Sequence, residues 1–367
     1  MYIVDLRASK TAAGGTRVEA NVDGEPLWFE SDDALLTPSA EAYASALLIP
    51  ASARGAALEL DTPIDTTWLD NVAAIMRVAK EWWGLAEIEV IAETAPTIVA
   101  TQPTGTAQCF TGGVDSYYAL VTATPPPDVL VFGHGFDIEL RDHRRLEAFV
   151  PSLKETASAY GSRPVVIKTN LRRHRALRQI SWEKAHGGAL AALGHLLNHE
   201  IGRLVIPSSY PYHDGKPWGT HWELDHLWSS RSLAVEHSDA SLRRNGKLRV
   251  VAQHEVALRH LRVCWENNAP TGNCSRCEKC VRTMLALSMC DRLQACRTFD
   301  RTLAIEARLD ALPSVSPHLL SIYEELRRGI ADQCVGAAVD RLIARSQGFP
   351  GCLRELAQRV RHALRTL

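Results

Sequence analysis

The stretch Cys109-Phe110-Thr111-Gly112-Gly113-Val114-Asp115-Ser116 decides the fold that we expect of this chain. It joins an apolar, strand-like run at Thr106–Phe110 to a segment with helical spacing from about Asp115 to Ala123. Adjacent glycines let a backbone approach a ligand without Cβ clashes, and the unpaired amides at a helix start attract anions. The stretch therefore predicts a strand–turn–helix unit with an anion-binding turn. The alternative is an ordinary tight turn into a helix.

Strand-like and helical segments continue to alternate on the C-terminal side of this stretch. The apolar runs are Val129–Phe132, Pro164–Lys168 and Leu204–Ile206, and the helical segments are around Arg141–Ala159 and from about Trp182 to His199. Short apolar strands that alternate with helices indicate a parallel sheet covered on both faces. We therefore expect an α/β fold with a doubly wound, Rossmann-like sheet.

The first hundred residues have a different composition from the rest. They hold 6 Lys or Arg against 16 Asp or Glu, although the net charge of the whole chain is −1. Strands are expected at Met1–Leu6, Pro26–Phe29 and Ala57–Leu60, and helices from near Ser39 and over Thr66–Trp83, with Thr66 as the cap. We expect residues 1–100 to form an acidic α+β module, residues 101–290 a catalytic domain, and residues 291–367 a helical C-terminal region. A solvated surface is the simpler explanation of the acidic charge.

The overall composition is that of a soluble globular protein, with 46% hydrophobic and 23% charged residues among 367. No run of about 18 apolar residues is present, and the N-terminus lacks a secretory pattern. We therefore expect a cytoplasmic protein that does not span a membrane. In a reducing compartment, nine cysteines indicate metal ligands rather than disulfides.

Four of these cysteines form a compact pattern, C-x9-C-x2-C-x2-C, made by Cys264, Cys274, Cys277 and Cys280. Gly272-Asn273 supplies a turn, and four soft ligands without an open position are typical of a structural Zn²⁺ site. An iron–sulfur cluster is the alternative, because tight C-x2-C-x2-C runs also hold such clusters. The remaining cysteines are expected to be buried thiols: Cys109, Cys290, Cys296, Cys334 and Cys352.

The order of residues in the glycine turn narrows the class of phosphate binder. It matches neither the Walker loop nor the dinucleotide fingerprint. It resembles the S-G-G-x-D-S signature of the PP-loop (HUP fold) enzymes, the adenine nucleotide α-hydrolases, with Thr111 in place of the first serine. That resemblance implies binding of ATP and Mg²⁺ by Thr111, Gly112, Gly113, Val114, Asp115 and Ser116, with Asp115 and Ser116 as catalytic residues. It also places adenine and ribose near His134 and Gly135, at the end of the second core strand.

The glycine turn and the cysteine pattern together resemble the 7-cyano-7-deazaguanine synthase (QueC) family over roughly Thr106 to Leu287. Arg282 also resembles an arginine near that point in the family. The resemblance implies that ATP activates a carboxylate and that ammonia then yields an amide and a nitrile. It does not extend to residues 1–100 or to the C-terminal helices.

The segment Ser208–Arg231 is dense in Tyr, His, Trp and Asp, which suits recognition of a substrate. We expect His221 and Asp225, together with Arg282, to contact the acceptor. A surface loop anchored by tryptophan is the alternative. Lys168, Asn170 and the basic run Arg172–Arg178 are further candidates for phosphate contacts, or a solvated helix face.

The expected activity is that of an ATP-dependent ligase that forms carbon–nitrogen bonds and releases AMP and pyrophosphate. Its acceptor would be a carboxylate of a small molecule, peptide or protein, and its donor ammonia or an amine. A tRNA thiolation enzyme is one alternative, although overall neutrality argues against an RNA surface. A nucleotide-binding module without turnover is another. A homodimer is compatible with the sequence.

Overall fold

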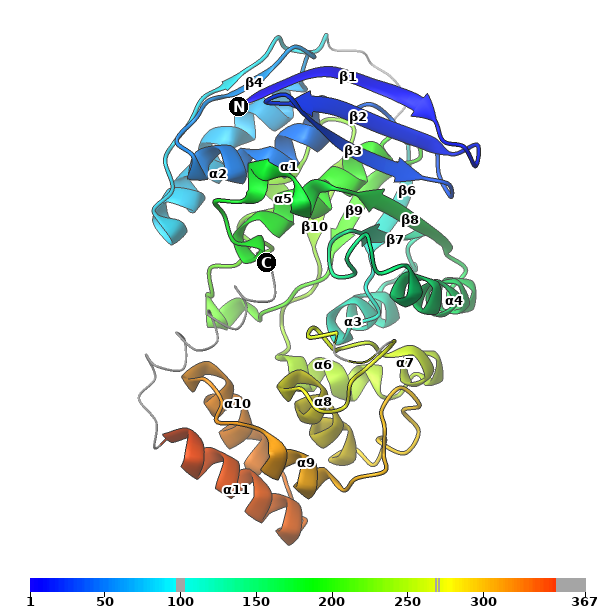
Figure 1. Cartoon of the computed structure of the whole chain (residues 1–367), viewed down its shortest axis with the longest axis vertical. Helices are drawn as coiled ribbons and strands as arrows, with labels where there is room; N and C mark the ends of the chain where they lie inside the picture. The colour runs from blue at the N-terminus through cyan, green and yellow to red at the C-terminus, as the bar shows by residue number, and fades with distance from the viewer. Residues whose placement is uncertain (97–102, 268, 270, 348–367) are drawn as a thin grey trace. The chain divides into compact units, whose positions relative to one another are not determined.

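The computed structural model describes residues 1–96, 103–267, 269 and 271–347. The chain forms two compact units, Met1–Lys247 and Leu248–Leu367 (Figure 1). This boundary coincides with neither of the boundaries expected near residues 100 and 290. The reason is that the N-terminal strands join the sheet of the central region instead of standing apart from it.

The first unit is built on one ten-stranded sheet in the order β10-β9-β6-β7-β8-β3-β2-β1-β4-β5. Its parallel half contains β6 (Gly105–Cys109), β7 (Val129–His134), β8 (Arg163–Thr169), β9 (Ile201–Ile206) and β10 (Ala234–His237). In chain order these five strands are arranged 3-2-1-4-5, as in Rossmann-like sheets. The expected parallel sheet is therefore confirmed.

The N-terminal strands extend this sheet through an antiparallel pair. Phe29 and Glu30 of β3 (Glu25–Ser31) pair with Thr169 and Lys168 of β8. The remaining strands are β2 (Thr16–Val22), β1 (Tyr2–Lys10), β4 (Leu58–Leu60) and β5 (Val90–Ile91). β2 was not expected from the sequence, although its burial alternates with a period of two.

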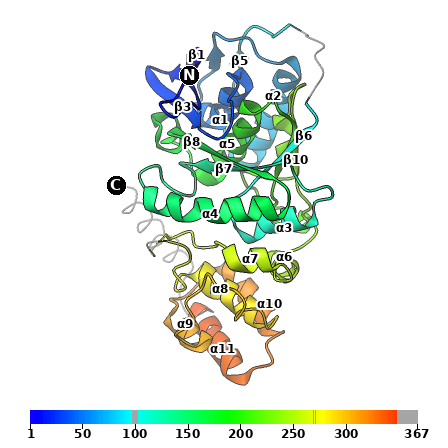
Figure 2. The same cartoon turned by 90° about the vertical axis from the view of Figure 1, so that its right-hand side faces the viewer.

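Helices cover both faces of the sheet (Figure 2). α1 (Ala40–Ala53), α2 (Thr66–Trp83) and α5 (Trp182–Leu196) share a core with Val129 and Val131 of β7. On the opposite face, Phe132 of β7 packs on Phe149 of α4 (His143–Ala159), with ring centroids 4.5 Å apart. All six residues of β7 are buried, which explains the apolar run Val129–Phe132 within it.

Helix α2 has the expected bounds but a different cap. Asp65, rather than Thr66, caps it: the Asp65 carboxylate accepts hydrogen bonds from the amides of Thr67 at 2.9 Å and Trp68 at 3.2 Å. Thr66 is the first helical residue. A carboxylate is a good acceptor for the free amides of a first turn, so aspartate takes the cap position.

Helices α1 and α5 approach each other closely at Gly188. A Cβ atom at this position would lie 2.0 Å from the carbonyl oxygen of Ser45. We expect Gly188→Ala to lower the free energy of unfolding by about 3 kcal/mol or more, because backbone must move. Gly246→Ala is the matched control, since its Cβ would meet Leu242 at an ordinary 3.4 Å. Urea denaturation of both variants measures the difference, and equal stabilities would contradict this packing.

The second unit is helical where it is described. Its helices are α7 (Glu255–His260), α8 (Glu278–Ser288), α9 (Ile305–Ala311), α10 (Pro317–Arg327) and α11 (Gln333–Gln347), while α6 (Arg244–Val251) spans the boundary between the units. The helical character expected after Cys280 is thus observed up to residue 347, and residues 348–367 lie outside the described part. Among the helices of the described ranges, none is both long and apolar enough to cross a membrane.

Candidate functional site

The glycine turn lies where the direction of strand addition changes. It follows β6, whose neighbours in the sheet are β7 on one side and β9 on the other. Ligands of open α/β sheets bind at such switch points, beyond the carboxyl ends of the strands. Gly112 has a φ of +72°, which favours glycine, and Gly113 is the N-cap residue of α3 (Val114–Thr122). The expected strand–turn–helix unit is therefore present at a position suited to an anion.

Ser116 braces this turn from inside the first turn of α3. Its hydroxyl donates a hydrogen bond to the Gly113 carbonyl at 3.0 Å and accepts one from the Thr111 amide at 3.4 Å. The side chain of Gln108 donates to the Ser116 carbonyl at 2.9 Å. These contacts fix the backbone of the turn before any ligand binds, which lowers the entropic cost of binding.

Two cations that the sequence analysis did not identify lie beside the turn. Arg244 Nη1 is 2.5 Å from Asp115 Oδ2, and Lys247 Nζ is 3.7 Å from Asp115 Oδ1. Lys247 is fully buried, and its ammonium donates to the carbonyl and hydroxyl of Ser208 at 2.6 and 2.7 Å. Burial lowers the pKa of Lys247, and the Asp115 charge partly offsets that shift. The ammonium also lies over the Tyr118 ring, 5.6 Å from its centroid, so Lys247 brings a buried positive charge to the start of α3.

The ends of β9 and β10 are tied to α3 by polar contacts. The hydroxyl of Ser208 donates to the Asp239 carbonyl at 2.6 Å. The phenol of Tyr118 in α3 donates to the Asp239 carboxylate at 2.8 Å. Asp115, Lys247, Ser208 and Asp239 thus form a continuous polar edge along the carboxyl ends of β6, β9 and β10.

His134 and Gly135 lie at the end of β7. His134 is buried, its Nε2 is 3.1 Å from the Glu139 carbonyl oxygen, and its Nδ1 has no hydrogen-bond partner among the described residues. Burial lowers the pKa of His134, so the neutral ring is favoured. Gly135 has a φ of +110°, and a Cβ there would lie 2.1 Å from the Thr169 carbonyl oxygen. The fold itself therefore requires this glycine.

The two acceptor candidates of the segment Ser208–Arg231 are both buried. His221 Nδ1 accepts a hydrogen bond from the Glu223 amide at 3.1 Å, and its ring centroid is 4.6 Å from that of Trp82. Asp225 is fully buried, with one carboxylate oxygen accepting from the His221 amide at 3.1 Å and the other 2.7 Å from Nδ1 of His237. His237 follows the segment in sequence and was not among the expected site residues.

Burial of His221 predicts acid sensitivity. It lowers the pKa of His221 to about 4, with a smaller contribution from His237. Because the unfolded chain binds a proton near pH 6.5 that the folded chain does not, stability present above pH 6.5 is lost as the pH falls toward 4. His221→Asn keeps an acceptor for the Glu223 amide and should reduce the stability lost between pH 7 and 5 by about 1 kcal/mol.

Denaturant titrations at the two pH values measure this difference. The matched control is His226→Asn, because His226 is exposed and, in the described part of the chain, its ring hydrogen-bonds only with the Trp222 carbonyl, 3.2 Å from Nδ1. The same pH dependence in His221→Asn and in the unsubstituted protein would show that His221 is not a source of the effect.

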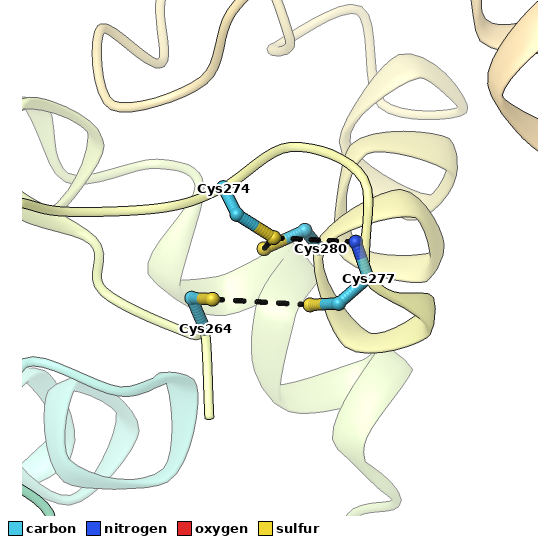
Figure 3. A group of neighbouring side chains, drawn as sticks. All are labelled: Cys264, Cys274, Cys277 and Cys280. Carbon is cyan, nitrogen blue, oxygen red and sulfur yellow. Dashed lines mark hydrogen bonds between the residues drawn. The ribbon is translucent and has the colours of Figure 1, made fainter. Parts of the chain in front are cut away.

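The four cysteines of the C-x9-C-x2-C-x2-C pattern converge in the second unit (Figure 3). Their sulfur atoms all lie within 4.8 Å of one another. The Cys264–Cys277 and Cys274–Cys280 sulfur pairs are each 3.9 Å apart. The group could hold a metal ion such as zinc, as the spacing predicted.

The backbone around these cysteines is shaped by its own polar groups. The Asn273 side chain accepts from the amides of Val263 at 2.8 Å and Cys264 at 3.1 Å, and donates to the Leu261 carbonyl at 2.8 Å. Gly272 and Ser275 have φ values of +66° and +58°, which turn the chain sharply between the ligands. Cys277 is the N-cap residue of α8, so Cys280 lies in the first turn of that helix.

The thiols of this group titrate together. Hydrogen bonds from the other three cysteines lower the pKa of Cys264, and the same close contacts raise the pKa of Cys280.

The remaining cysteines were expected to be buried, and this is correct for Cys109 and Cys296. It is wrong for Cys334, which is exposed, and Cys290 is only half-buried; Cys352 lies outside the described residues. Cys334 lies on α11 just before Val335, the first buried residue of that helix, and is not part of the helix's buried face.

Arg282 lies in the second unit, on α8. Its Nε is 2.8 Å from Glu278 Oε1, one helical turn earlier. His221 and Asp225 belong to the first unit.

The further basic candidates have structural partners. Lys168 of β8 is 3.1 Å from Asp32, which follows β3, and Asn170, which follows β8, donates to the Pro26 carbonyl of β3 at 2.8 Å. Both contacts hold the β3 segment against the β8 segment. Arg172 donates to the Phe136 carbonyl at 2.6 Å. These contacts give the residues a role in the fold.

Comparisons of the chain with protein-family models, with curated proteins and with solved structures found no match. The glycine turn and the cysteine group are therefore the features of this chain that bear on its function.

Proposed function

We propose that the chain is an ATP-dependent synthetase of the PP-loop type, similar to QueC, which adenylylates a carboxylate and transfers the acyl group to ammonia or an amine. The observation that carries this proposal is the glycine turn at the sheet's switch point, with Arg244 and Lys247 beside Asp115. The 3-2-1-4-5 strand order supports it, because the HUP fold to which PP-loop enzymes belong is Rossmann-like.

The proposed chemistry assigns a task to each group at the turn. The amides of the turn and the hydroxyls of Thr111 and Ser116 would bind the β- and γ-phosphates of ATP. Asp115 would supply a carboxylate to Mg²⁺, and Arg244 would then pair with phosphate oxygens instead of with Asp115. Lys247 would neutralise charge that develops on the departing pyrophosphate.

The proposed reaction has two steps, adenylylation of the carboxylate and transfer of the acyl group to nitrogen. A carboxylate oxygen of the acceptor attacks the α-phosphorus of ATP, the bond to the β-phosphate oxygen breaks, and pyrophosphate leaves. The nitrogen nucleophile then attacks the carbonyl carbon, the bond to the AMP oxygen breaks, and an amide forms. Neither step needs a covalent bond to the protein, so orientation and charge neutralisation would supply the rate enhancement.

For the cysteine group we propose one structural Zn²⁺ ion. With Zn–S bonds of about 2.3 Å, a tetrahedron has sulfur–sulfur edges of ~3.8 Å. The observed pairs at 3.9 Å fit this size. An iron–sulfur cluster places its thiolates on different irons with sulfide between them, which requires a wider group than one within 4.8 Å. Zinc would hold the loop from Cys264 to Cys277 onto α8.

Product analysis tests the proposed reaction. The protein is incubated with ATP, Mg²⁺, an ammonium salt and one of two probe carboxylates, 7-carboxy-7-deazaguanine or a short peptide with a free C-terminus. We expect AMP and pyrophosphate in equal amounts. ADP and inorganic phosphate would contradict the mechanism, and stimulation by bulk tRNA alone would favour thiolation. Binding of ATP with no products in any arm would favour a nucleotide-binding module.

A further inference from the structure

We propose that His237 accepts a proton from the nitrogen nucleophile, and that Asp225 is its positioning residue. The inference rests on the proposed function, which it extends to the second step of the reaction. It draws on three features of the first unit: the Asp225–His237 contact, the free nitrogen of the imidazole, and the place of His237 on the sheet.

The contact fixes which nitrogen of His237 carries hydrogen. Nδ1 lies 2.7 Å from Oδ2 of Asp225, and an ionised carboxylate only accepts, so Nδ1 donates. The other oxygen of Asp225 is held by the His221 amide at 3.1 Å. Asp225 is wholly buried and the His237 side chain is 6% exposed, so the pair is shielded from competing water. A carboxylate in this position orients a histidine and stabilises its protonated form.

The second nitrogen of the ring is available. Nε2 of His237 makes no hydrogen bond within the described ranges, and it points away from Asp225 across the ring. With Nδ1 protonated, Nε2 carries a lone pair. This is the arrangement of a general base, in which Nε2 can accept a proton from a substrate.

His237 lies on the same edge of the sheet as the glycine turn. It is the last residue of β10 and pairs with Ile206, the last residue of β9, which lies next to β6. Burial raises the pKa of Cys109, the last residue of β6, and the Asp225 charge adds to that shift. Two strand spacings of about 4.8 Å separate β10 from β6, so ~10 Å lies between the turn and His237. With the β- and γ-phosphates at the turn, an acyl group joined to the neighbouring α-phosphate fits within that span.

The proton transfer completes the second step. As the nitrogen forms its bond to the carbonyl carbon, the carbon–oxygen bond to AMP breaks and AMP leaves with the electron pair. A proton of the attacking nitrogen moves to Nε2 of His237, while Asp225 stabilises the imidazolium. Activation of the carboxylate does not involve this proton, so the first step needs no His237.

The two steps can be measured separately with the probe carboxylates. Exchange of labelled pyrophosphate into ATP reports adenylylation, and amide formation from ammonia reports transfer. We expect His237→Gln to keep the exchange within about twofold and to slow amide formation about 10²- to 10⁴-fold. Asp225→Asn should also slow amide formation, because it reverses the hydrogen bond that sets the tautomer. Hydroxylamine is a weaker base than ammonia, so the nitrogen of its adduct loses a proton to water more readily, and hydroxamate formation should fall much less.

His226→Gln is the matched control, since this exposed histidine lies beside Asp225 in sequence and should change neither step. Equal losses in exchange, amide and hydroxamate would mean that His237 only supports the fold. Unchanged amide formation in His237→Gln would overturn the assignment while leaving the proposed function in place. Absence of both exchange and AMP in the unsubstituted protein would instead reject the proposed function, and this inference with it.

Discussion

Purified protein is expected to contain about one zinc per chain, and Cys277→Ser is expected to lose it and unfold the second unit. Cys277 contributes one of four converging sulfurs and is the residue before α8, so its loss opens the metal site and releases the start of that helix from the metal. Metal binding supplies on the order of 10 kcal/mol of folding free energy in small zinc domains. We expect a loss of at least ~3 kcal/mol here, because α8 to α11 also bury apolar surface.

Metal analysis and denaturation of the variant measure both effects. Cys334→Ser is the matched control, because Cys334 is exposed and lies outside the group. It should keep its metal and its stability. A brown protein with iron and labile sulfide would contradict the zinc assignment. So would a metal-free Cys277→Ser variant that is as stable as the unsubstituted protein.

Arg244→Ala is expected to weaken binding of magnesium pyrophosphate by about 10- to 100-fold. Hydrogen bonds to charged groups contribute about 1.5–3 kcal/mol, and each 1.4 kcal/mol is a tenfold change in affinity. The side chain lies against Asp115 and is well placed to transfer to a phosphate. Calorimetric titration with pyrophosphate needs no knowledge of the acceptor.

The neighbouring Arg243→Ala provides the control for charge alone. Arg243 is 2.7 Å from Asp214, away from the turn, so its removal should change the affinity less than twofold. Equal losses in the two variants would indicate a general electrostatic effect. Full affinity in Arg244→Ala would remove Arg244 from the proposed phosphate site.

The sequence was sufficient for those parts of the molecule that local patterns determine. The strand β6, the glycine turn and α3 follow one another directly along the chain. Three of the four cysteines, Cys274, Cys277 and Cys280, are also close together in the sequence. Parallel strands buried on both faces have continuous apolar runs, which is why β7 was recognisable.

Residues that reach a site through tertiary contacts were missed. Arg244 and Lys247 are separated from Asp115 by more than a hundred residues, and only the fold brings them together. Their spacing in the sequence could have identified them as a pair, since an arginine and a lysine three positions apart share one face of a helix. His237 was missed because β10 is a short edge strand of four residues. Asp225 was expected to contact the acceptor, but its burial and its contact with His237 arise only in the folded chain.

The most direct test of the central claim follows the oxygen atoms of the carboxylate. Each probe carboxylate is labelled with ¹⁸O and incubated with the protein, MgATP and an ammonium salt. If the carboxylate attacks the α-phosphorus, one of its oxygens stays with the phosphate when the amide forms, so mass spectrometry should find AMP that carries one ¹⁸O. Unlabelled AMP, or ¹⁸O in inorganic phosphate with ADP as the nucleotide product, would contradict adenylylation.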